Sequence, residues 1–233
     1  MQILFEDNHC LAVNKPAPLL TQAPAGIPSL EDMAKAYLKE RYRKSGNVYL
    51  GVPHRLDRPV SGVVLFARTT KAAQRLSEQF QQRKVAKIYW GALEGTVAPE
   101  QGLWEDWLRK VADEARVETA APGAQDARQA RLAYRVLGPC TDGTLVEFTP
   151  ETGRMHQIRI QTATRGWPVR GDALYGARLG FGLPAESARE QIIALHARRL
   201  TFLHPIRYEP ITVTAPLPEA WKPLGIEVPD TEG

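Results

Sequence analysis

Residues 54–62 read HRLDRPVSG and run directly into the apolar segment VVLFA at residues 63–67. One aspartate, Asp57, stands between two arginines, whose positive charges favour its ionised carboxylate form. Pro59 restricts the backbone and Gly62 frees it, so that a short loop can present one side chain at the edge of a sheet. The stretch therefore predicts an anionic carboxylate at the start of a strand, suited to a nucleophile or a general base. From local chemistry alone, a solvated cluster of ion pairs is the competing interpretation.

The composition indicates a globular protein with a sizeable core. Hydrophobic residues make up 43% and charged residues 24% of the 233 positions, enough for one large domain or two small lobes. The formal charge of +4 favours an anionic partner, although proteins that bind none also carry such an excess. The two cysteines, Cys10 and Cys140, lie far apart and indicate neither a disulfide framework nor a zinc site. Acidic residues near the N-terminus, and the lack of an apolar run of about 18 residues, predict a cytoplasmic protein.

Hydrophobic patterns predict strands mixed with a few helices. Two short apolar runs flank residues 6–9 and predict a hairpin. Periods of 3.6 residues predict one helix that begins after Ser29 and another that begins at Thr69 or Thr70. Without regular alternation of strand and helix, the pattern does not favour a parallel βαβ fold. Further strands are predicted at residues 87–93, 130–137, 145–148 and 211–214.

Four segments lack one clear pattern. Residues 16–28 contain four prolines and predict a loop. Residues 96–129 indicate an irregular connection with short strands, which would be the natural place for a boundary between two lobes. Residues 155–164 fit a short helix, but their isoleucines also alternate as in a strand. Residues 217–233 predict a tail that is poorly ordered at its tip.

The loop at residues 54–62 resembles the signature of the RluA-type pseudouridine synthases, HRLDxxTSG. The chain departs from that family's pattern at Val60, where Thr is usual, and at Met155, where Thr or Ser is usual. Neither position carries the chemistry that the resemblance implies. The likeness continues through residues 67–73 and 87–89 and resumes at residues 152–159, 171–176, 195–200 and 204–205.

The resemblance implies an α+β fold, with a mixed, largely antiparallel bent sheet in two lobes. It implies an enzyme that isomerises uridine in tRNA or rRNA to pseudouridine without a cofactor and has RNA as its partner. A monomer is the default expectation, with no obligate protein partner and no membrane as a partner. Residues 1–233 would form a single catalytic domain with no separate N-terminal RNA-binding module.

The resemblance also implies roles for individual residues. Asp57 would be the catalytic carboxylate, acting either as a nucleophile on the sugar or as the base that removes a sugar proton. Arg159 would pair with Asp57 through its planar guanidinium, and Tyr89 would stack on the target base, which must flip out of its helix. Arg55 would occupy the space that the flipped nucleotide leaves in the RNA, and Arg154 would contact phosphate. His54 would fix the signature loop by hydrogen bonding. Leu200 or an apolar neighbour would form the wall opposite Tyr89 around the target base.

Two other classes of protein compete with this interpretation. A catalytically silent RNA-binding module on the same scaffold is one, but binding alone would not require an aspartate at a phosphate-facing position. An N-glycosidase or a nuclease is the other, and would need a second carboxylate or a metal cluster near Asp57. Asp172 is the one candidate for that carboxylate, and the resemblance makes it structural. The five histidines show no metal-ligand spacing, and no nucleotide-binding fingerprint is present, so no metal or cofactor is predicted.

Overall fold

The computed structural model describes residues 1–226, which divide into two compact units. The chain passes from the first unit to the second inside strand β4 (Ala86–Glu94), between Tyr89 and Trp90. Residues 96–129, where the sequence suggested a lobe boundary, lie within the second unit. The first unit comprises Met1–Tyr89, Ala185–Ile192 and His196–Pro216, and the second comprises Trp90–Pro184, Ile193–Leu195 and the rest of the described chain.

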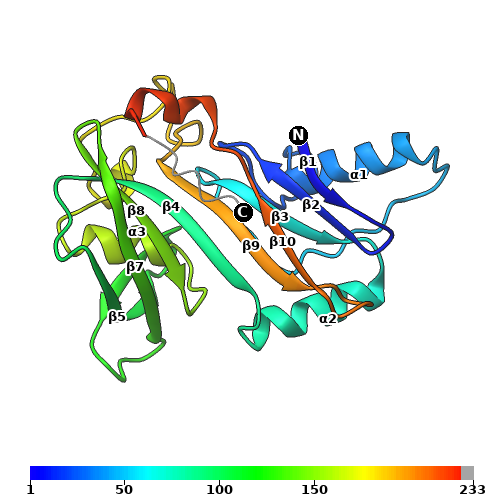
Figure 1. The fold of residues 1–233 in the computed structure, drawn as a ribbon, viewed down its shortest axis with the longest axis horizontal. Helices are drawn as coiled ribbons and strands as arrows, with labels where there is room; N and C mark the ends of the chain where they lie inside the picture. The colour runs from blue at the N-terminus through cyan, green and yellow to red at the C-terminus, as the bar shows by residue number, and fades with distance from the viewer. Residues whose placement is uncertain (227–233) are drawn as a thin grey trace. The chain divides into compact units, whose positions relative to one another are not determined.

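The first unit contains a mixed sheet. Strand β1 (Gln2–Glu6) pairs with β2 (Cys10–Lys15), and β2 pairs with β3 (Ser61–Ala67), both antiparallel, so the predicted hairpin is confirmed. A short parallel contact joins β3 to β9 (Leu195–Leu203), which pairs antiparallel with β10 (Pro210–Thr214). Figure 1 shows these strands side by side.

Two helices begin where the sequence predicted. The side chains of Ser29 and Thr69 each accept a hydrogen bond from a backbone N–H three residues later, which caps α1 (Leu30–Arg41) and α2 (Thr70–Gln81). Helix α2 then packs one apolar side against the sheet, because its alanines and leucine recur at helical spacing. The buried core of this unit comprises Cys10, Ala12, Val63, Leu65, Ala67, Ala72, Leu76, Val85, Leu200, Phe202, Val213 and Ala215.

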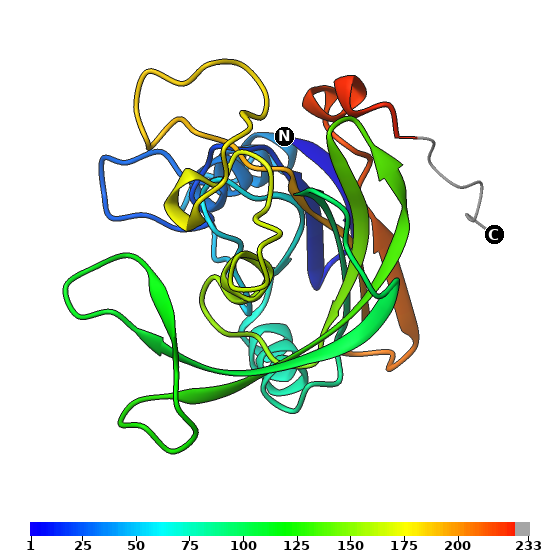
Figure 2. The same ribbon diagram turned by 90° about the vertical axis from the view of Figure 1, so that its left-hand side faces the viewer.

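The second unit is built on antiparallel strands in the order β8-β7-β5-β6, and Figure 2 shows the long β5 and β7 from one side. Strands β7 (Arg128–Cys140) and β8 (Gly143–Pro150) fall where strands were predicted. Strands β5 (Gln101–Lys110) and β6 (Val117–Ala120) replace most of the predicted irregular connection. The irregular part of that prediction was wrong. Asp106 stands between the buried Trp104 and Leu108 on one face of β5, and Trp107 stands among charged residues on the other, so apolar and polar residues do not alternate.

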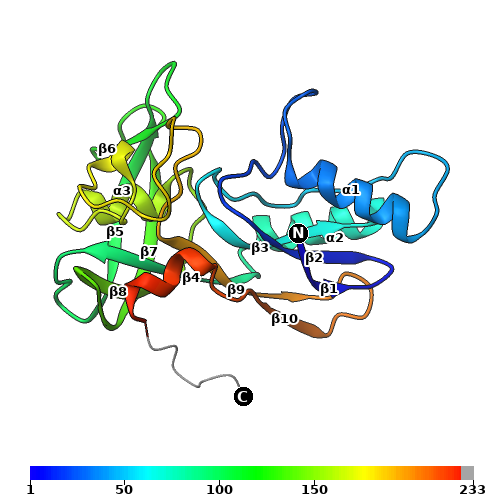
Figure 3. The same ribbon diagram turned by 90° about the horizontal axis from the view of Figure 1, so that it is seen from above.

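Residues 155–164 form a helix rather than a strand. Helix α3 (Gln157–Ala163) is buried along most of its length, and Ile160 packs into a small core with Leu108, Val117 and Ala130. Figure 3 shows α3 beside β5 and β6. With few helices and mostly antiparallel strands, the fold is of the predicted α+β class.

Short 3-10 helices complete the described chain. One, η1 (Ala173–Tyr175), follows α3, and the other, η2 (Glu219–Leu224), lies in the C-terminal segment. The predicted poorly ordered tip of the tail falls outside the described residues. None of the helices within residues 1–226 is both long enough and apolar enough to cross a membrane.

The parallel contact between β3 and β9 brings two backbones close together. A Cβ atom placed on Gly62 would lie 2.3 Å from the carbonyl oxygen of Ala197, and Gly62 has a φ of +117°. Next to it, the Ser61 hydroxyl lies 2.8 Å from Nδ1 of His196, whose Nε2 lies 3.2 Å from the carbonyl oxygen of Ala215. The ring proton therefore sits on Nε2, and Ser61 donates to Nδ1. Burial lowers the pKa of His196 to about 4, which keeps the ring neutral.

We predict that Gly62→Ala destabilises the protein strongly, because a side chain there meets backbone atoms that cannot rotate away and favours a negative φ. Overpacking and backbone strain together cost at least about 2 kcal/mol of unfolding free energy. Urea unfolding measures the difference. Gly46→Ala is the control, since no heavy atom lies within 4 Å of the added Cβ. Equal stability of the two variants would show that β3 and β9 are not held this closely.

Candidate active site

The loop that carries Asp57 is held on both sides by residues of an earlier loop. On one side, the Thr21 hydroxyl donates to the carbonyl of Leu56 and accepts from its N–H, both at 3.1 Å. On the other side, the N–H of Leu19 donates to the carbonyl of Arg58 at 3.1 Å. The peptides before and after Asp57 are therefore fixed, which restricts where its carboxylate can point.

Lys15 strengthens this attachment from inside the protein. Its side chain is fully buried, and Nζ donates to the carbonyls of Pro16 at 3.1 Å, Leu19 at 2.7 Å and Arg58 at 3.2 Å. Burial lowers the pKa of Lys15 to about 7, while the charge of Asp57 opposes that shift. Sequence reasoning missed this residue. Its only signal is a lysine at the end of an apolar strand, directly before a proline.

Tyr89 lies close enough to Asp57 for the two side chains to interact electrostatically. It is half-buried on β4, and burial together with the negative charge of Asp57 raises the pKa of its hydroxyl above the usual value. The phenol is therefore neutral at physiological pH. A neutral ring beside a carboxylate can pack on an uncharged base without adding a second negative charge.

His54 is also neutral, and its ring contacts two residues of the first unit. Its Nε2 accepts a hydrogen bond from the N–H of Leu65 at 2.9 Å, and its ring stacks on Phe80 with centroids 4.6 Å apart. Burial, assisted by the positive charge of Lys87, lowers the pKa of His54 to about 3. The imidazole therefore ties the signature loop to β3 and α2.

The other two residues of the first unit that the resemblance singled out lie in different environments. Arg55 is exposed on the loop, where its guanidinium can reach an external anion. Leu200 is only 3% exposed and belongs to the hydrophobic core of the unit. The first unit thus brings together the Asp57 loop, Tyr89 and His54, and directs Leu200 into its interior.

In the second unit, Arg159 forms a buried bidentate ion pair with Asp172. Its Nε donates to Oδ2 of Asp172 at 2.6 Å, and its Nη2 donates to Oδ1 at 2.8 Å. The guanidinium carbon also lies 5.1 Å from the centre of the Tyr175 ring. In the sequence, Asp172 was the one candidate for the second carboxylate of an N-glycosidase or a nuclease. In the structure it is the partner of Arg159.

Arg154 precedes α3 and is fixed through its backbone and its side chain. Its N–H donates at 3.0 Å to the Oε1 of Gln157, which also accepts a hydrogen bond from the Thr152 hydroxyl at 2.7 Å. Its Nε donates to the carbonyl of Gln129 at 3.0 Å. The turn before α3 is thus held by one buried glutamine, and Arg154 is half-buried beside it.

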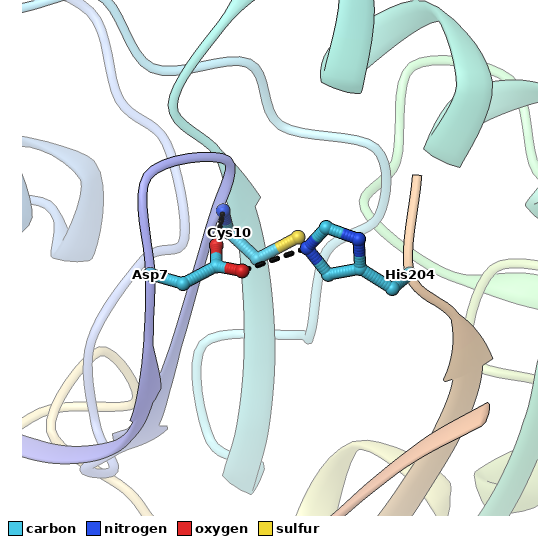
Figure 4. A group of neighbouring side chains, drawn as sticks. All are labelled: Asp7, Cys10 and His204. Atoms are coloured by element: carbon cyan, nitrogen blue, oxygen red, sulfur yellow. Dashed lines mark hydrogen bonds and ion pairs between the residues drawn. The ribbon is translucent and has the colours of Figure 1, made fainter. Parts of the chain in front are cut away.

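One cluster of possible metal ligands exists among residues 1–226, formed by Asp7, Cys10 and His204 (Figure 4). Oδ1 of Asp7 accepts from two backbone N–H groups, and its Oδ2 lies 2.7 Å from Nε2 of His204 and 3.2 Å from a nitrogen of Arg207. Nδ1 of His204 accepts from two backbone N–H groups, so the ring proton must lie on Nε2.

A metal ion does not fit this donor set. Binding at Nε2 of His204 would require an imidazolate, because Nδ1 is already an acceptor. Burial and the charge of Asp7 raise the pKa of the Cys10 thiol to about 12, while a metal needs the thiolate. The guanidinium of Arg207 would also repel a cation. The cluster instead joins the turn between β1 and β2 to the turn after β9 by hydrogen bonds.

The chain is similar to known proteins over most of its length. Residues 9–164 match the family described as RNA pseudouridylate synthase. The chain is 33% identical to tRNA pseudouridine synthase C of Haemophilus ducreyi, with 96% of this chain and 94% of that protein covered. It is 32% identical to the dual-specificity RNA pseudouridine synthase RluA of Vibrio vulnificus, covering 88% and 78%. It is also 33% identical to ribosomal large subunit pseudouridine synthase D of Xylella fastidiosa, of which it spans 66%.

Solved structures show the same fold. Human RNA pseudouridylate synthase domain containing 4 superposes with a TM-score of 0.79 at 24% identity, covering 98% of this chain and 95% of the human chain. Human RNA pseudouridylate synthase domain containing 1 gives a TM-score of 0.72 at 24% identity, covering 95% and 85%. The fold that the resemblance implied is confirmed.

We predict that Lys15 makes stability depend on pH. Its pKa in the folded protein, about 7, lies below that of an unfolded lysine, about 10.4. Between these values the unfolded chain binds more protons, so the unfolding free energy of the wild type rises with pH relative to Lys15→Met. The slope is at most about 1.4 kcal/mol per pH unit.

Urea unfolding of both proteins between pH 7 and 10 measures this difference. Lys39→Met, which alters an exposed lysine of α1, is the control and should leave the pH dependence of the wild type unchanged. If the stability of Lys15→Met ran parallel to that of the wild type over this range, Lys15 would not be a buried ammonium with a lowered pKa.

Proposed function

We propose that this chain, which belongs to the RNA pseudouridylate synthase family, isomerises specific uridines in structured RNA to pseudouridine. The observation that carries the proposal is the position of Asp57. Hydrogen bonds fix the peptides on both sides of this residue, and the neutral ring of Tyr89 lies close to its carboxylate. The names of the relatives point to tRNA or rRNA as the substrate.

The proposed reaction breaks the bond between N1 of uracil and C1′ of the sugar, turns the base, and joins its C5 to the same C1′. The proton on C5 is lost and N1 gains one, so the RNA keeps its mass. Asp57 acts either by attacking C1′ or by removing a sugar proton, and both routes need its ionised form. No redox change occurs and no group is added, so the proposed chemistry requires no cofactor.

Tyr89 is the proposed platform for the flipped base. Stacking of a base on an aromatic ring contributes roughly 1 to 3 kcal/mol, and it is needed here because the base must be retained while it is detached from the sugar. The position of the ring beside Asp57 supports this role, and the neutral phenol does not repel the RNA. We propose that Arg159 supplies the positive charge used in the reaction. Its two hydrogen bonds to Asp172 fix the plane of its guanidinium group.

The remaining residues are proposed to hold RNA rather than to react. Arg55 would occupy the space left by the flipped nucleotide and contact the backbone, and Arg154 would contact phosphate. His54 would act through the loop, because it is neutral and already bonded to Leu65. We assign no role to Leu200, since its burial in the core supports a packing function.

The proposal extends to the organisation of the protein. We propose that residues 1–233 act as one catalytic domain and that the protein works as a monomer in the cytoplasm. RNA recognition would then depend on loops of the two units, including residues 16–28, in which the Leu19 N–H and the Thr21 hydroxyl hold the Asp57 loop.

We predict that Asp57→Asn lowers turnover at least about 100-fold, because the amide can neither attack C1′ nor remove a proton. RNA affinity should stay within a few-fold, since shape and charge around the loop are retained. Release of tritium from RNA labelled at uridine C5 measures turnover, and filter binding measures affinity. Asp126→Asn, in an exposed turn, is the control. Wild-type turnover by Asp57→Asn would remove Asp57 from the mechanism. RNA binding without release by any variant would favour the silent RNA-binding module.

We also predict that RNA binding weakens with salt, and that Arg55→Gln reduces the slope of log affinity against log salt by about 0.7. The physical reason is that one fewer phosphate charge is neutralised by the protein. Lys222→Gln is the control, because Lys222 is exposed and already paired with Glu219. An unchanged slope in Arg55→Gln would exclude a phosphate contact at Arg55.

A further inference from the structure

We infer that Asp172 is the positioning residue of Arg159, and that Tyr175 completes the support of the same guanidinium. This inference rests on the proposed function, in which Arg159 supplies the cation. It assigns no substrate contact to Asp172 or Tyr175. Both act by fixing the plane and direction of the arginine side chain.

The ion pair between Arg159 and Asp172 is bidentate. Both oxygens of Asp172 are used, at 2.6 and 2.8 Å, and they meet Nε and Nη2 of Arg159. Two parallel hydrogen bonds between planar groups fix a guanidinium in plane and in rotation, which a single contact cannot do. Nη1 is the nitrogen that this pairing does not occupy, so its direction is set by the other two.

The ion pair between Arg159 and Asp172 is almost fully buried. The side chains of Arg159 and Asp172 are 6% and 1% exposed, whereas those of Arg165 and Asp106, a pair at the other end of α3, are 24% and 19% exposed. Burying two charges is costly, and replacing a buried ion pair with apolar side chains is often neutral or stabilising. Stability alone is therefore a poor reason for this pair, and fixing the direction of Arg159 supplies a better one.

Tyr175 is held against the guanidinium of Arg159. Its ring centre lies 5.1 Å from the guanidinium carbon. Its hydroxyl accepts from the N–H of Val117 at 3.0 Å and is hydrogen-bonded to Nδ1 of His156 at 2.8 Å. The tyrosine hydroxyl is thus tied both to β6 and to the residue before α3, and the ring forms a fixed face for the arginine.

The turn that carries Asp172 is held by several backbone hydrogen bonds. The N–H of Asp172 donates to the carbonyl of Val169, and its own carbonyl accepts from the N–H groups of Tyr175 and Ala177. Farther along, the carboxylate of Glu94 on β4 accepts from the backbone of residues 178 and 179. A turn with this many internal bonds presents both Asp172 and Tyr175 to Arg159 in one arrangement.

The test compares Asp172→Asn with Asp106→Asn, which breaks the more exposed pair of the same kind. We expect Asp172→Asn to lower the single-turnover rate of tritium release by about 10- to 100-fold, because a small misplacement of a reacting group has that effect. Its RNA affinity should stay within about threefold, and Asp106→Asn should change neither quantity. A wild-type rate in Asp172→Asn, or losses of rate and affinity in equal measure, would overturn the inference.

A double-mutant cycle with Arg159→Lys tests whether Asp172 acts through Arg159. Lysine keeps the charge but has no planar fork to align, so adding Asp172→Asn to Arg159→Lys should cause little further loss of rate. Losses that multiply would mean that Asp172 acts independently of Arg159. Should Asp172→Asn fail to fold, Asp172→Glu keeps the charge and moves it by one methylene, and the same comparison applies.

A measurement without RNA separates this inference from the proposed function. In protein with ¹⁵N-labelled arginine, the Nε–H of Arg159 should exchange slowly with solvent, since it is buried and bonded to Asp172. Arg159→Lys identifies its resonance. The slow exchange should persist in Asp106→Asn and disappear in Asp172→Asn. Slow exchange in Asp172→Asn would overturn the inference, whereas absence of tritium release from the wild type would count against the proposed function alone.

Discussion

The first unit depends on one row of backbone contacts that crosses three strands. Gly62 of β3 is paired with Lys15 of β2 on one side and with Ala197 of β9 on the other. No side chain fits at Gly62, and the Lys15 side chain turns inward to three carbonyls, one of them in the Asp57 loop. The loop that carries the carboxylate needed by the proposed chemistry is therefore attached to a point of the sheet where two backbones leave no room for a side chain, which limits the movement of the loop before any RNA binds.

The charges of the two units are arranged differently. In the first unit, Tyr89 beside Asp57 and His54 in the same loop are neutral, and Lys15 is fully buried. In the second unit the buried charges form a matched pair, Arg159 with Asp172. A carboxylate beside a neutral aromatic ring is suited to covalent or proton-transfer chemistry at a sugar, and an arginine fixed by a carboxylate is suited to acting as a stationary positive charge.

The sequence predicted those parts of the fold that depend on local patterns. The hairpin of β1 and β2 follows from two apolar runs around a turn, and α1 and α2 follow from their capping residues and apolar spacing. Strand β5 was missed because the charged Asp106 stands between its two buried residues and interrupts the apolar face. Local chemistry pointed to Asp57, whereas family likeness identified Arg159 and Tyr89 as candidate site residues.

What could not be predicted from the sequence depends on contacts distant along the chain. The role of Lys15 requires the carbonyl of Arg58, which a loop brings back 43 residues later. Asp172 could be recognised as the partner of Arg159 only once the turn after α3 had been placed. Leu200 matched a family position for a base-facing wall, but its surroundings in the core became visible only with the packing of β9 and β10.

The central claim is that the protein rearranges a glycosidic bond within RNA and releases nothing but the C5 proton. The most direct measurement is a complete digest of tRNA and rRNA to nucleosides after incubation with the protein, with separation and mass analysis of the products. The account predicts that pseudouridine appears in the amount by which uridine decreases, with no free uracil. Loss of uridine with release of uracil, and no pseudouridine, would contradict it and indicate an N-glycosidase.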